Sequence, residues 1–550
     1  MNRSAHVDTF ARDNLPPRET WPEFVFDLPE LQYLERMNCG VELLDNAIAR
    51  GFGERTAIIA EDGRQLTYAH LLANVNRMAH VLVDELGLVP GNRVLLRGAN
   101  SPAMATAWFA VIKAGGIAVA TMALLRAREL TDIITKAEVT HALCDAQLGA
   151  ELDAARPACP TLREIAFFGG DGADSMESRA RSKSDQFASV DTAADDVALI
   201  AFTSGTTGKP KGTMHFHRDV MAACDCWPRA TLRANADDIF TGSPPLAFTF
   251  GLGGLLLFPM RIGAATLLLA RPGPEQLLAA IAQHRATVSF TAPTSYRAMA
   301  PLVGQHDLRS LRKCVSAGEA LPAATRKLWK DATGIEIIDG IGSTEMLHIF
   351  ISHDEDHARP GATGTPVPGY RACIMDDAGH PLPPGNVGYL AVKGPTGCRY
   401  LADSRQSNYV RDGWNYTGDA YALDDDGYFI YQARTDDMIV SAGYNIAGPE
   451  VESALLLHPA VSECGVVGVD DAQRGQIVKA FVVLKPGFAP DAAMTLALQD
   501  FVKQTIAPYK YPRAIEYTAA LPRTEVGKLQ RYKLRSATTN TLERSAVQPE

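Results

Sequence analysis

An alternation of apolar runs near the N-terminus constrains the fold of this chain more than any other feature. Residues 93–97 indicate a short strand, residues 101–114 an apolar helix begun by Ser101 and Pro102, and residues 117–121 a second strand. A strand, a helix and a strand in this order predict a crossover connection between parallel strands. We therefore expect a parallel sheet covered by helices.

The same alternation recurs in the middle of the chain and then gives way to another pattern. Residues 287–300 repeat a strand followed by a helix, and residues 313–338 contain a strand, a helix and a second strand. Farther on, short strands of alternating polarity are expected at 389–392 and 428–431. The acidic run 424–427 favours a hairpin turn over a calcium loop, because a calcium loop needs spaced oxygen ligands and a later Glu.

A smaller α+β unit is expected after about residue 435. Its predicted elements are two helices and two strands, at 450–458, 494–505, 461–469 and 477–484. The expected fold class is therefore α/β, with a large N-terminal domain of parallel-type sheets and a β-rich subdomain, and a small, mobile α+β C-terminal domain. The predicted domains are residues 1–435 and 436–550.

Composition excludes several classes of protein. The 550 residues carry a net charge of −10 and 46% are hydrophobic, which is globular usage without the basic surface of a non-specific nucleic-acid binder. Residues 1–16 lack the apolar core of a signal peptide. The most apolar window, 252–270, contains Pro259 and Arg261, so a buried strand and helix are expected there rather than a membrane span. Nine cysteines without CxxC pairs argue against a disulfide framework and fit the cytoplasm.

A loop rich in phosphate-type donors follows a predicted buried strand at 197–202. Glycines let the backbone approach a phosphate, and hydroxyl and ammonium groups add donors and charge. Two residues separate Gly205 from Gly208, whereas a Walker loop has four there, so the ordinary kinase and NTPase interpretations are excluded. A flexible polar linker is disfavoured. The expected nucleotide-binding residues of the loop are Thr203, Ser204, Gly205, Thr206, Thr207, Gly208 and Lys209.

Further polar motifs follow in the second half of the chain. Residues 339–345 come after a predicted strand, at the edge where open parallel sheets bind ligands. Glu345 offers a hard oxygen ligand for Mg²⁺. A helix beginning at Ser343 is a structural alternative that could hold at the same time. Asp419 is a carboxylate suited to ribose hydroxyls, and Arg434 lies just before the predicted domain boundary.

In this order the motifs resemble those of the adenylate-forming superfamily, which includes acyl-CoA synthetases, peptide-synthetase adenylation domains and firefly luciferase. The resemblance covers nearly the whole chain and implies Mg²⁺, ATP and coenzyme A as the required small molecules. It implies that Lys528 bridges the substrate carboxylate and the α-phosphate, where an ammonium offsets the repulsion of two anions. It also implies that Asp436 is the hinge of the mobile domain and that the loop around Gly443 serves thioester formation.

The resemblance assigns further residues by position. The equivalents of Thr344 and Glu345 meet phosphate and metal, and Ile341 stands where the family often has Tyr, so adenine stacking would be aliphatic. Nucleotide contacts are implied for Gly318, Glu319, Asp339, Gly340, Ile341, Gly342, Ser343, Asp419, Arg434 and Lys528. CoA contacts are implied for Gly443, Tyr444, Arg474 and Lys510, although a surface cluster is nearly as well supported around Lys510.

The predicted acid pocket is apolar and flat. Phenyl and aliphatic walls around glycines suit an aromatic ring. His348 could exchange a hydrogen bond with an ortho substituent or simply pack at the rim. The expected lining is Phe248, Thr249, Phe250, Gly251, Ala317, Gly318, Gly342, His348 and Ile349.

Two segments resemble one branch of the superfamily. Residues 339–349 resemble benzoate-CoA ligases, and residues 5–31 resemble most of all 2-aminobenzoate-CoA ligases. This resemblance implies a cytoplasmic acid–thiol ligase of aromatic acid degradation, with no nucleic-acid or membrane partner and a homodimer as one allowed assembly. A free-standing enzyme that loads a carrier protein and a medium-chain fatty acyl-CoA synthetase stay open. The run 353–357 is rich in metal ligands but lacks the HExxH order, and a solvated loop is expected there.

Overall fold

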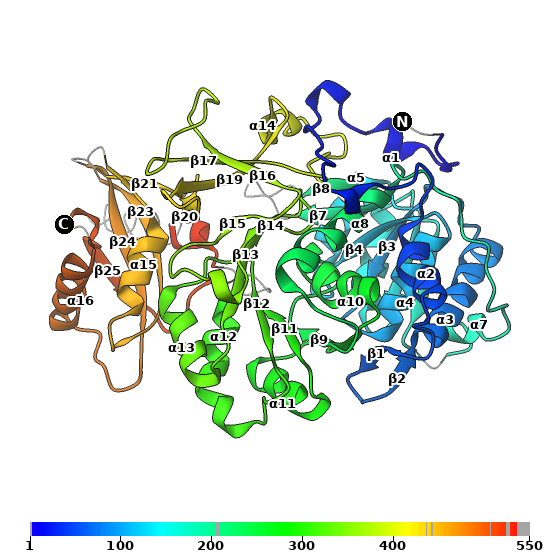
Figure 1. Cartoon of the computed structure of the whole chain (residues 1–550), viewed down its shortest axis with the longest axis horizontal. Coiled ribbons are helices and arrows are strands. Elements are labelled where there is room, and N and C mark those ends of the chain that lie inside the picture. Colours follow the sequence, from blue (N-terminus) through cyan, green and yellow to red (C-terminus); the bar gives the residue numbers. More distant parts are fainter. Residues whose placement is uncertain are drawn as a thin grey trace, which may run out of the picture.

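The computed structural model describes residues 3–170, 172–203, 210–435, 437–441, 444–471, 474–506, 508–523 and 529–535. Figure 1 shows a large N-terminal region, blue to yellow, and a small C-terminal region, orange to red. Among the described residues, three sheets lie in the large region and a fourth lies in the small region. The expected α/β fold class, with a large N-terminal and a smaller C-terminal domain, is confirmed.

A six-stranded sheet in the order β6-β5-β3-β4-β7-β8 contains the predicted strand–helix–strand unit. β3 and β4 run parallel, and the hydroxyl of Ser101 caps the intervening helix by accepting a hydrogen bond from the N–H of Met104 at 3.1 Å. The elements are β3 (Arg93–Arg97), α4 (Pro102–Lys113), β4 (Ile117–Thr121), α5 (Ala127–Ala137), β5 (His141–Asp145), α6 (Gly149–Ala155), β6 (Glu164–Phe168), α7 (Met176–Ala180), β7 (Val197–Thr203), β8 (Lys211–Phe216) and α8 (His217–Asp225).

A nine-stranded sheet has the order β15-β14-β13-β12-β11-β9-β10-β1-β2, and its central strands are parallel. The carboxyl ends of these strands therefore meet at one edge. The elements are α2 (Asn46–Ala49), β1 (Thr56–Ala60), β2 (Gln65–Thr67), α3 (Tyr68–His80), β9 (Ile239–Gly242), α9 (Thr249–Leu252), α10 (Phe258–Ile262), β10 (Ala265–Leu268), α11 (Pro274–His284), β11 (Val288–Thr291), α12 (Pro293–Met299), β12 (Lys313–Ser316), α13 (Ala323–Thr333), β13 (Ile337–Gly342), β14 (Ile349–Ser352) and β15 (Thr365–Pro366).

The third sheet is antiparallel and includes the predicted hairpin. Its strands are β16 (Arg371–Met375), β17 (Val387–Lys393), β18 (Val410–Arg411), β19 (Trp414–Leu423) and β20 (Phe429–Arg434), with α14 (Gln406–Tyr409) before β18. In the acidic run the carboxylate of Asp424 accepts a hydrogen bond from the N–H of Tyr428 at 2.7 Å, which closes the turn between β19 and β20. The hairpin prediction is confirmed.

The small domain contains the two helices and two long strands expected from the sequence. Its elements are β21 (Ile439–Ser441), β22 (Tyr444–Ile446), α15 (Gly448–Leu456), β23 (Val461–Asp471), β24 (Gly475–Leu484), α16 (Ala492–Thr505) and β25 (Ala514–Tyr517). α15 contacts α13, so the small domain packs beside the nine-stranded sheet (Figure 1). The predicted boundary residue, Asp436, lies outside the described residues.

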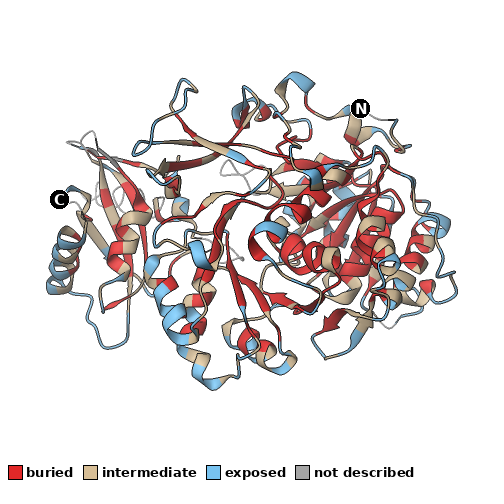
Figure 2. Ribbon diagram, in the orientation of Figure 1, coloured by how far each residue is buried: buried red, intermediate tan, exposed pale blue. Residues whose placement is uncertain are grey.

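The central strands of the large region are buried, as the colours of Figure 2 show, and most of their buried side chains are apolar. The window 252–270 forms buried helix and strand, as expected, and within the described residues no helix is long and apolar enough to cross a membrane. All nine cysteines are free thiols, and all but the half-buried Cys373 are buried. They pack as small apolar side chains.

Candidate active site

The predicted phosphate loop connects two antiparallel strands. Thr203, the last residue of β7, is in register with Lys211, the first residue of β8. Ser204, Gly205, Thr206, Thr207, Gly208 and Lys209 lie outside the described residues. The hydroxyl oxygen of Thr203, at the start of the loop, is buried and has no hydrogen-bond partner within the described residues, which is uncommon for a buried polar atom.

The predicted nucleotide residues of the nine-stranded sheet gather at the carboxyl ends of its parallel strands. Ser316, the last residue of β12, is in register with Asp339 on β13. Ala317, Gly318 and Glu319 follow directly, and Gly318 has a φ of +91°, which favours glycine. A carboxylate oxygen of Glu319 accepts a hydrogen bond from Thr294 at 3.3 Å.

Asp339 is the buried titratable group of this edge. Burial raises the pKa of its carboxyl to about 7, against the opposing effect of Arg326. Its Oδ1 has no hydrogen-bond partner among the described residues. Its backbone N–H donates to Nε2 of His353 at 3.3 Å. The sheet thus presents a buried carboxyl with a raised pKa at a position for which the family resemblance implied a nucleotide contact.

The segment after Asp339 forms a strand end and a turn. Gly340 lies against Ile349, where a Cβ would come within 2.8 Å of that side chain. Ile341 and Gly342 continue β13, and Ile341 is partly buried. Ser343 accepts a hydrogen bond from the N–H of Met346 at 3.2 Å, but the next residues form a turn. The alternative of a helix beginning at Ser343 is therefore wrong, because the chain turns directly into β14.

Thr344 and Glu345 lie in this turn, beside β8. The carbonyl of Thr344 contacts Nε2 of His215 at 2.8 Å. The side chain of Glu345 is 9% exposed, and its Oε1 accepts a hydrogen bond from the hydroxyl of Tyr400 at 2.6 Å. Nζ of Lys211 lies 3.5 Å from the same oxygen. Tyr400 was absent from the predicted site, whereas Lys211 belongs to the stretch 203–212 in which phosphate binding was expected.

The Glu345 carboxylate fits a magnesium site of the kind that nucleotides complete. Within the described residues no group of three His, Cys, Asp or Glu side chains could hold a metal ion. Mg²⁺ in nucleotide sites is commonly held by one or two carboxylates together with substrate phosphates. The Glu345 carboxylate alone could therefore be the protein ligand of an Mg²⁺ ion that binds together with the nucleotide phosphates.

Asp419 and Arg434 face each other across the β19–β20 hairpin. The two residues are in register, and Nη1 of Arg434 donates to Oδ1 of Asp419 at 3.1 Å and to the carbonyl of Thr417 at 3.1 Å. Gly418 has a φ of +77°, and a Cβ there would come within 2.7 Å of the guanidinium. The hairpin thus brings together two residues for which nucleotide contacts were implied.

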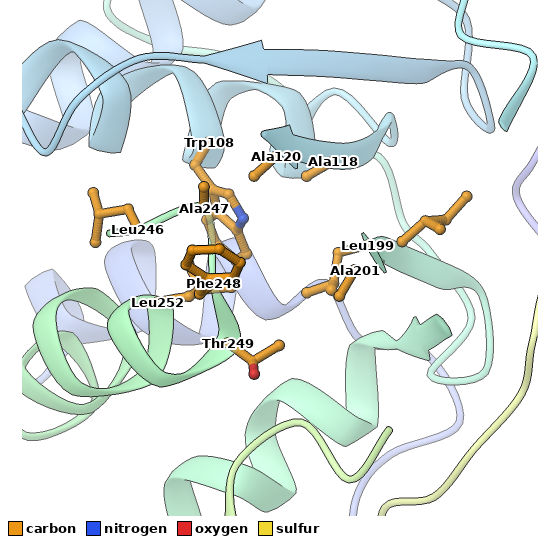
Figure 3. A pocket seen from close by; sticks show the side chains of 11 residues that line it. Trp108, Ala118, Ala120, Leu199, Ala201, Leu246, Ala247, Phe248, Thr249 and Leu252 are labelled. Atoms are coloured by element: carbon orange, nitrogen blue, oxygen red, sulfur yellow. The ribbon is translucent and has the colours of Figure 1, made fainter. Parts of the chain in front are cut away.

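The predicted acid-pocket residues fall into two groups. Phe248 and Thr249 line a small apolar cavity against Trp108 of α4 and the alanines of β4 and β7 (Figure 3). Gly251 meets the backbone of Pro245, where a Cβ would lie 2.1 Å from the carbonyl oxygen, so glycine is needed there for close approach.

The second group surrounds His348. Its ring packs edge-on against Phe258 at 4.5 Å between centroids and lies 5.7 Å from the rings of Phe250 and Trp227. Gly342 approaches its backbone so closely that a Cβ would lie 2.7 Å from the His348 carbonyl, and the buried Ile349 follows it. Burial lowers the pKa of His348 to about 3, so the imidazole is neutral.

The residues expected at coenzyme A and at the domain hinge are described only in part. Gly443, Asp436 and Lys528 lie outside the described residues, as does the side chain of Tyr444. Arg474 is exposed. Lys510 makes an ion pair with Glu450 at 2.6 Å, which matches the surface-cluster alternative.

The run 353–357 is a loop with a short turn whose last two residues are exposed, as expected, but its first residue is not in solvent. His353 is buried, and its Nε2 lies 3.0 Å from Nη2 of Arg326 in addition to the Asp339 contact. Asp354 caps the short turn that follows by accepting hydrogen bonds from the N–H groups of Asp356 and His357. The prediction was wrong for His353, because this residue directly follows the buried strand β14 and contacts Asp339 and Arg326.

Comparisons with known proteins point to one family. The family model described as "AMP-binding enzyme" matches residues 46–400, and the model of the AMP-binding enzyme C-terminal domain matches residues 450–528. A benzoate–CoA ligase of Thauera aromatica is 36% identical over 92% of this chain and 98% of that protein. A 4-hydroxybenzoate–CoA/benzoate–CoA ligase of Rhodopseudomonas palustris is 32% identical over 94% and 97%. The crystal structure of the anthranilate CoA ligase AuaEII with anthranoyl-AMP superposes with a TM-score of 0.87 at 34% identity, over 93% of this chain and 99% of that one.

Proposed function

The chain belongs to the AMP-binding enzyme family and is an ATP-dependent aryl-carboxylate CoA ligase, and we propose that its preferred acid is 2-aminobenzoate, with benzoate second. The reaction consumes acid, ATP and CoA and yields aryl-CoA, AMP and pyrophosphate. In the first step a carboxylate oxygen forms a bond to the α-phosphorus and the bond to pyrophosphate breaks. In the second step the thiol sulfur bonds to the acyl carbon, AMP leaves and the thiol loses its proton.

Positioning and electrostatics are the means by which the residues of the site would act. Asp339 and the segment to Ser343 would hold the base, and the paired Asp419 and Arg434 would hold the ribose. Mg²⁺, held by Glu345 and the phosphates, would neutralise charge on the leaving pyrophosphate. Lys528 would offset the repulsion between the carboxylate and the α-phosphate, and rotation at Asp436 would then bring the Gly443 loop to the adenylate.

The proposed choice of acid rests on the hydrogen-bonding state of His348. Its neutral ring has one N–H, and its Nε2 lies 3.4 Å from the carbonyl oxygen of Phe250. A carbonyl only accepts, so the proton belongs on Nε2 and Nδ1 is an acceptor. Nδ1 is buried without a hydrogen-bond partner among the described residues. An N–H donor ortho to the carboxylate would satisfy that atom, which supports 2-aminobenzoate over benzoate.

A pyrophosphate-release assay tests the proposal. The panel contains 2-aminobenzoate, benzoate, 2-methylbenzoate and medium-chain fatty acids. We expect the highest kcat/KM on 2-aminobenzoate and a lower value on 2-methylbenzoate, which has the same shape without a donor. Faster turnover of the fatty acids would overturn the aryl assignment, and equal turnover of the two ortho-substituted acids would overturn the role of His348.

The acceptor and the setting are proposed with their own tests. CoA is the proposed acceptor of the acyl group, and a phosphopantetheinyl carrier protein is the alternative. A direct comparison of the rates with the two thiols decides between them. The proposed setting is the cytoplasm, supported by nine free cysteines, which fit a reducing compartment. A homodimer is the proposed assembly, and the mass of the protein in solution tests it.

A further inference from the structure

Three segments that are far apart in the sequence meet at Glu345. Residues 399–401 extend the sheet beyond β8, because the N–H of Met214 donates to the carbonyl of Arg399 at 2.8 Å and the N–H of Leu401 donates to the carbonyl of Gly212 at 2.8 Å. Tyr400 and Thr213 form an antiparallel bridge between these segments. The end of the phosphate loop is thus joined to Tyr400 by main-chain hydrogen bonds.

Tyr400 connects a cation and an anion at this junction. Nζ of Lys211 donates to the Tyr400 hydroxyl at 2.8 Å, and that hydroxyl donates to Oε1 of Glu345 at 2.6 Å. Tyr400 is fully buried, and Glu345 nearly so. A phenolic hydroxyl has one O–H donor and lone pairs that can accept, and it ordinarily keeps its proton near neutral pH. One oxygen therefore accepts from Lys211 while it donates to Glu345.

The two oxygens of the Glu345 carboxylate are not equivalent. Oε1 receives the Tyr400 hydrogen bond and is the oxygen nearest Lys211. Among the described residues no side chain or N–H group donates a hydrogen bond to Oε2, and Oε2 is not among the fully buried atoms that lack a partner. Mg²⁺ demands near-ideal octahedral geometry at short distances, so a carboxylate held in one orientation binds it better than a rotating one.

We propose that Lys211 and Tyr400 are positioning residues for Glu345, which fix its Oε1 and leave Oε2 as the single oxygen that binds Mg²⁺. This inference rests on the proposed role of Glu345 as metal ligand. It adds that the lysine after the phosphate loop acts through Tyr400 on the metal. Lys211 also balances the charge of a carboxylate that is largely removed from water before the metal arrives.

Metal binding without turnover tests the inference. Mn²⁺ is titrated by electron paramagnetic resonance into enzyme saturated with an ATP analogue that cannot be cleaved between the α- and β-phosphates. For Tyr400→Phe we expect the half-saturating Mn²⁺ concentration to rise about tenfold, as for outer-shell partners of metal ligands. Lys211→Met should give a similar rise and Lys211→Arg a smaller one. The same variants should need more Mg²⁺ for pyrophosphate exchange, with an unchanged KM for the acid.

Tyr68→Phe is the matched control, because Tyr68 is equally buried and its hydroxyl donates to the carbonyl of Ala264 at 2.7 Å, outside the Lys211–Tyr400–Glu345 contacts. A Tyr400→Phe enzyme that loses thermal stability like this control yet keeps wild-type Mn²⁺ affinity would overturn the inference. Glu345→Gln separates a failure of the proposed metal-ligand role of Glu345 from a failure of the positioning role of Lys211 and Tyr400. If that variant itself binds Mn²⁺ normally, the metal-ligand role in the proposed function fails. If it weakens Mn²⁺ while Tyr400→Phe and Lys211→Met do not, only the positioning role fails.

Discussion

Nη1 of Arg523 in the small domain lies 3.5 Å from Oε1 of Glu319 at the nucleotide edge of the large domain. The same guanidinium contacts Glu463 of the small domain at 2.9 Å. Arg523 also forms an antiparallel bridge with Leu529. The two residues that flank the segment containing Lys528 therefore lie side by side. The Arg523–Glu319 ion pair therefore links the two domains directly before the segment that contains the proposed catalytic lysine.

Arg523→Gln should slow the first half-reaction more than the second. The pair is partly exposed, and such pairs contribute at most about 1 kcal/mol, which corresponds to about a fivefold change. Pyrophosphate exchange measures the first step and thioester formation from supplied acyl-AMP the second. Lys479→Gln, which breaks a pair with Glu516 inside the small domain, is the control. Equal slowing of both steps would argue against a role for the pair in adenylation.

Lys528→Ala should abolish adenylation and largely keep thioester formation from supplied acyl-AMP. In the proposed mechanism the Lys528 ammonium would offset the repulsion between two anions only while the carboxylate attacks the α-phosphate. The two half-reactions are measured separately, with Lys503→Ala as control, because Lys503 lies on α16, is partly exposed and pairs with Asp500. Equal loss of both steps would contradict this division between the half-reactions.

His348→Leu should reduce the preference for 2-aminobenzoate over benzoate by about threefold to tenfold, the range of a single neutral hydrogen bond. Because burial holds the pKa of His348 near 3, the wild-type preference should be constant between about pH 5.5 and 8. The ratio of kcat/KM values for the two acids is the measurement. Phe250→Leu is the control for lost packing and should affect both acids alike. A preference that disappears below about pH 6.5 would show that the imidazole titrates there instead.

Asp339→Asn should stabilise the protein at pH 8 but not at pH 4. The folded pKa of about 7 lies above the unfolded value near 4, so the folded state holds the proton more tightly. Stability from this group is present below about pH 4, is lost as the pH rises toward 7, and stays lost above it. The expected gain at pH 8 is a few kcal/mol in the free energy of unfolding by urea. Asp331→Asn on α13, which removes an exposed partner of Lys327, is the control substitution.

Local patterns in the sequence were sufficient for the elements and for the order of the motifs. Ser101 and Pro102 mark the start of α4, the apolar run at 93–97 is β3, and the acidic run at 424–427 is the β19–β20 turn. These features depend on residues near one another in the chain, where capping, periodicity and turn chemistry act. The family resemblance then indicated the class of reaction.

Contacts between distant segments were decided by the tertiary structure alone. Nothing near Tyr400 in the sequence predicts its hydrogen bond to Glu345, and nothing near Arg523 predicts its pairing with Glu319. His353, expected in solvent, lies in the interior because β14 pairs there with β13. Such contacts follow from how sheets and domains pack, which no short stretch of sequence encodes. The sequence by itself therefore determined the elements and the kind of chemistry, and the packing decided which lysine, tyrosine and arginine stand beside it.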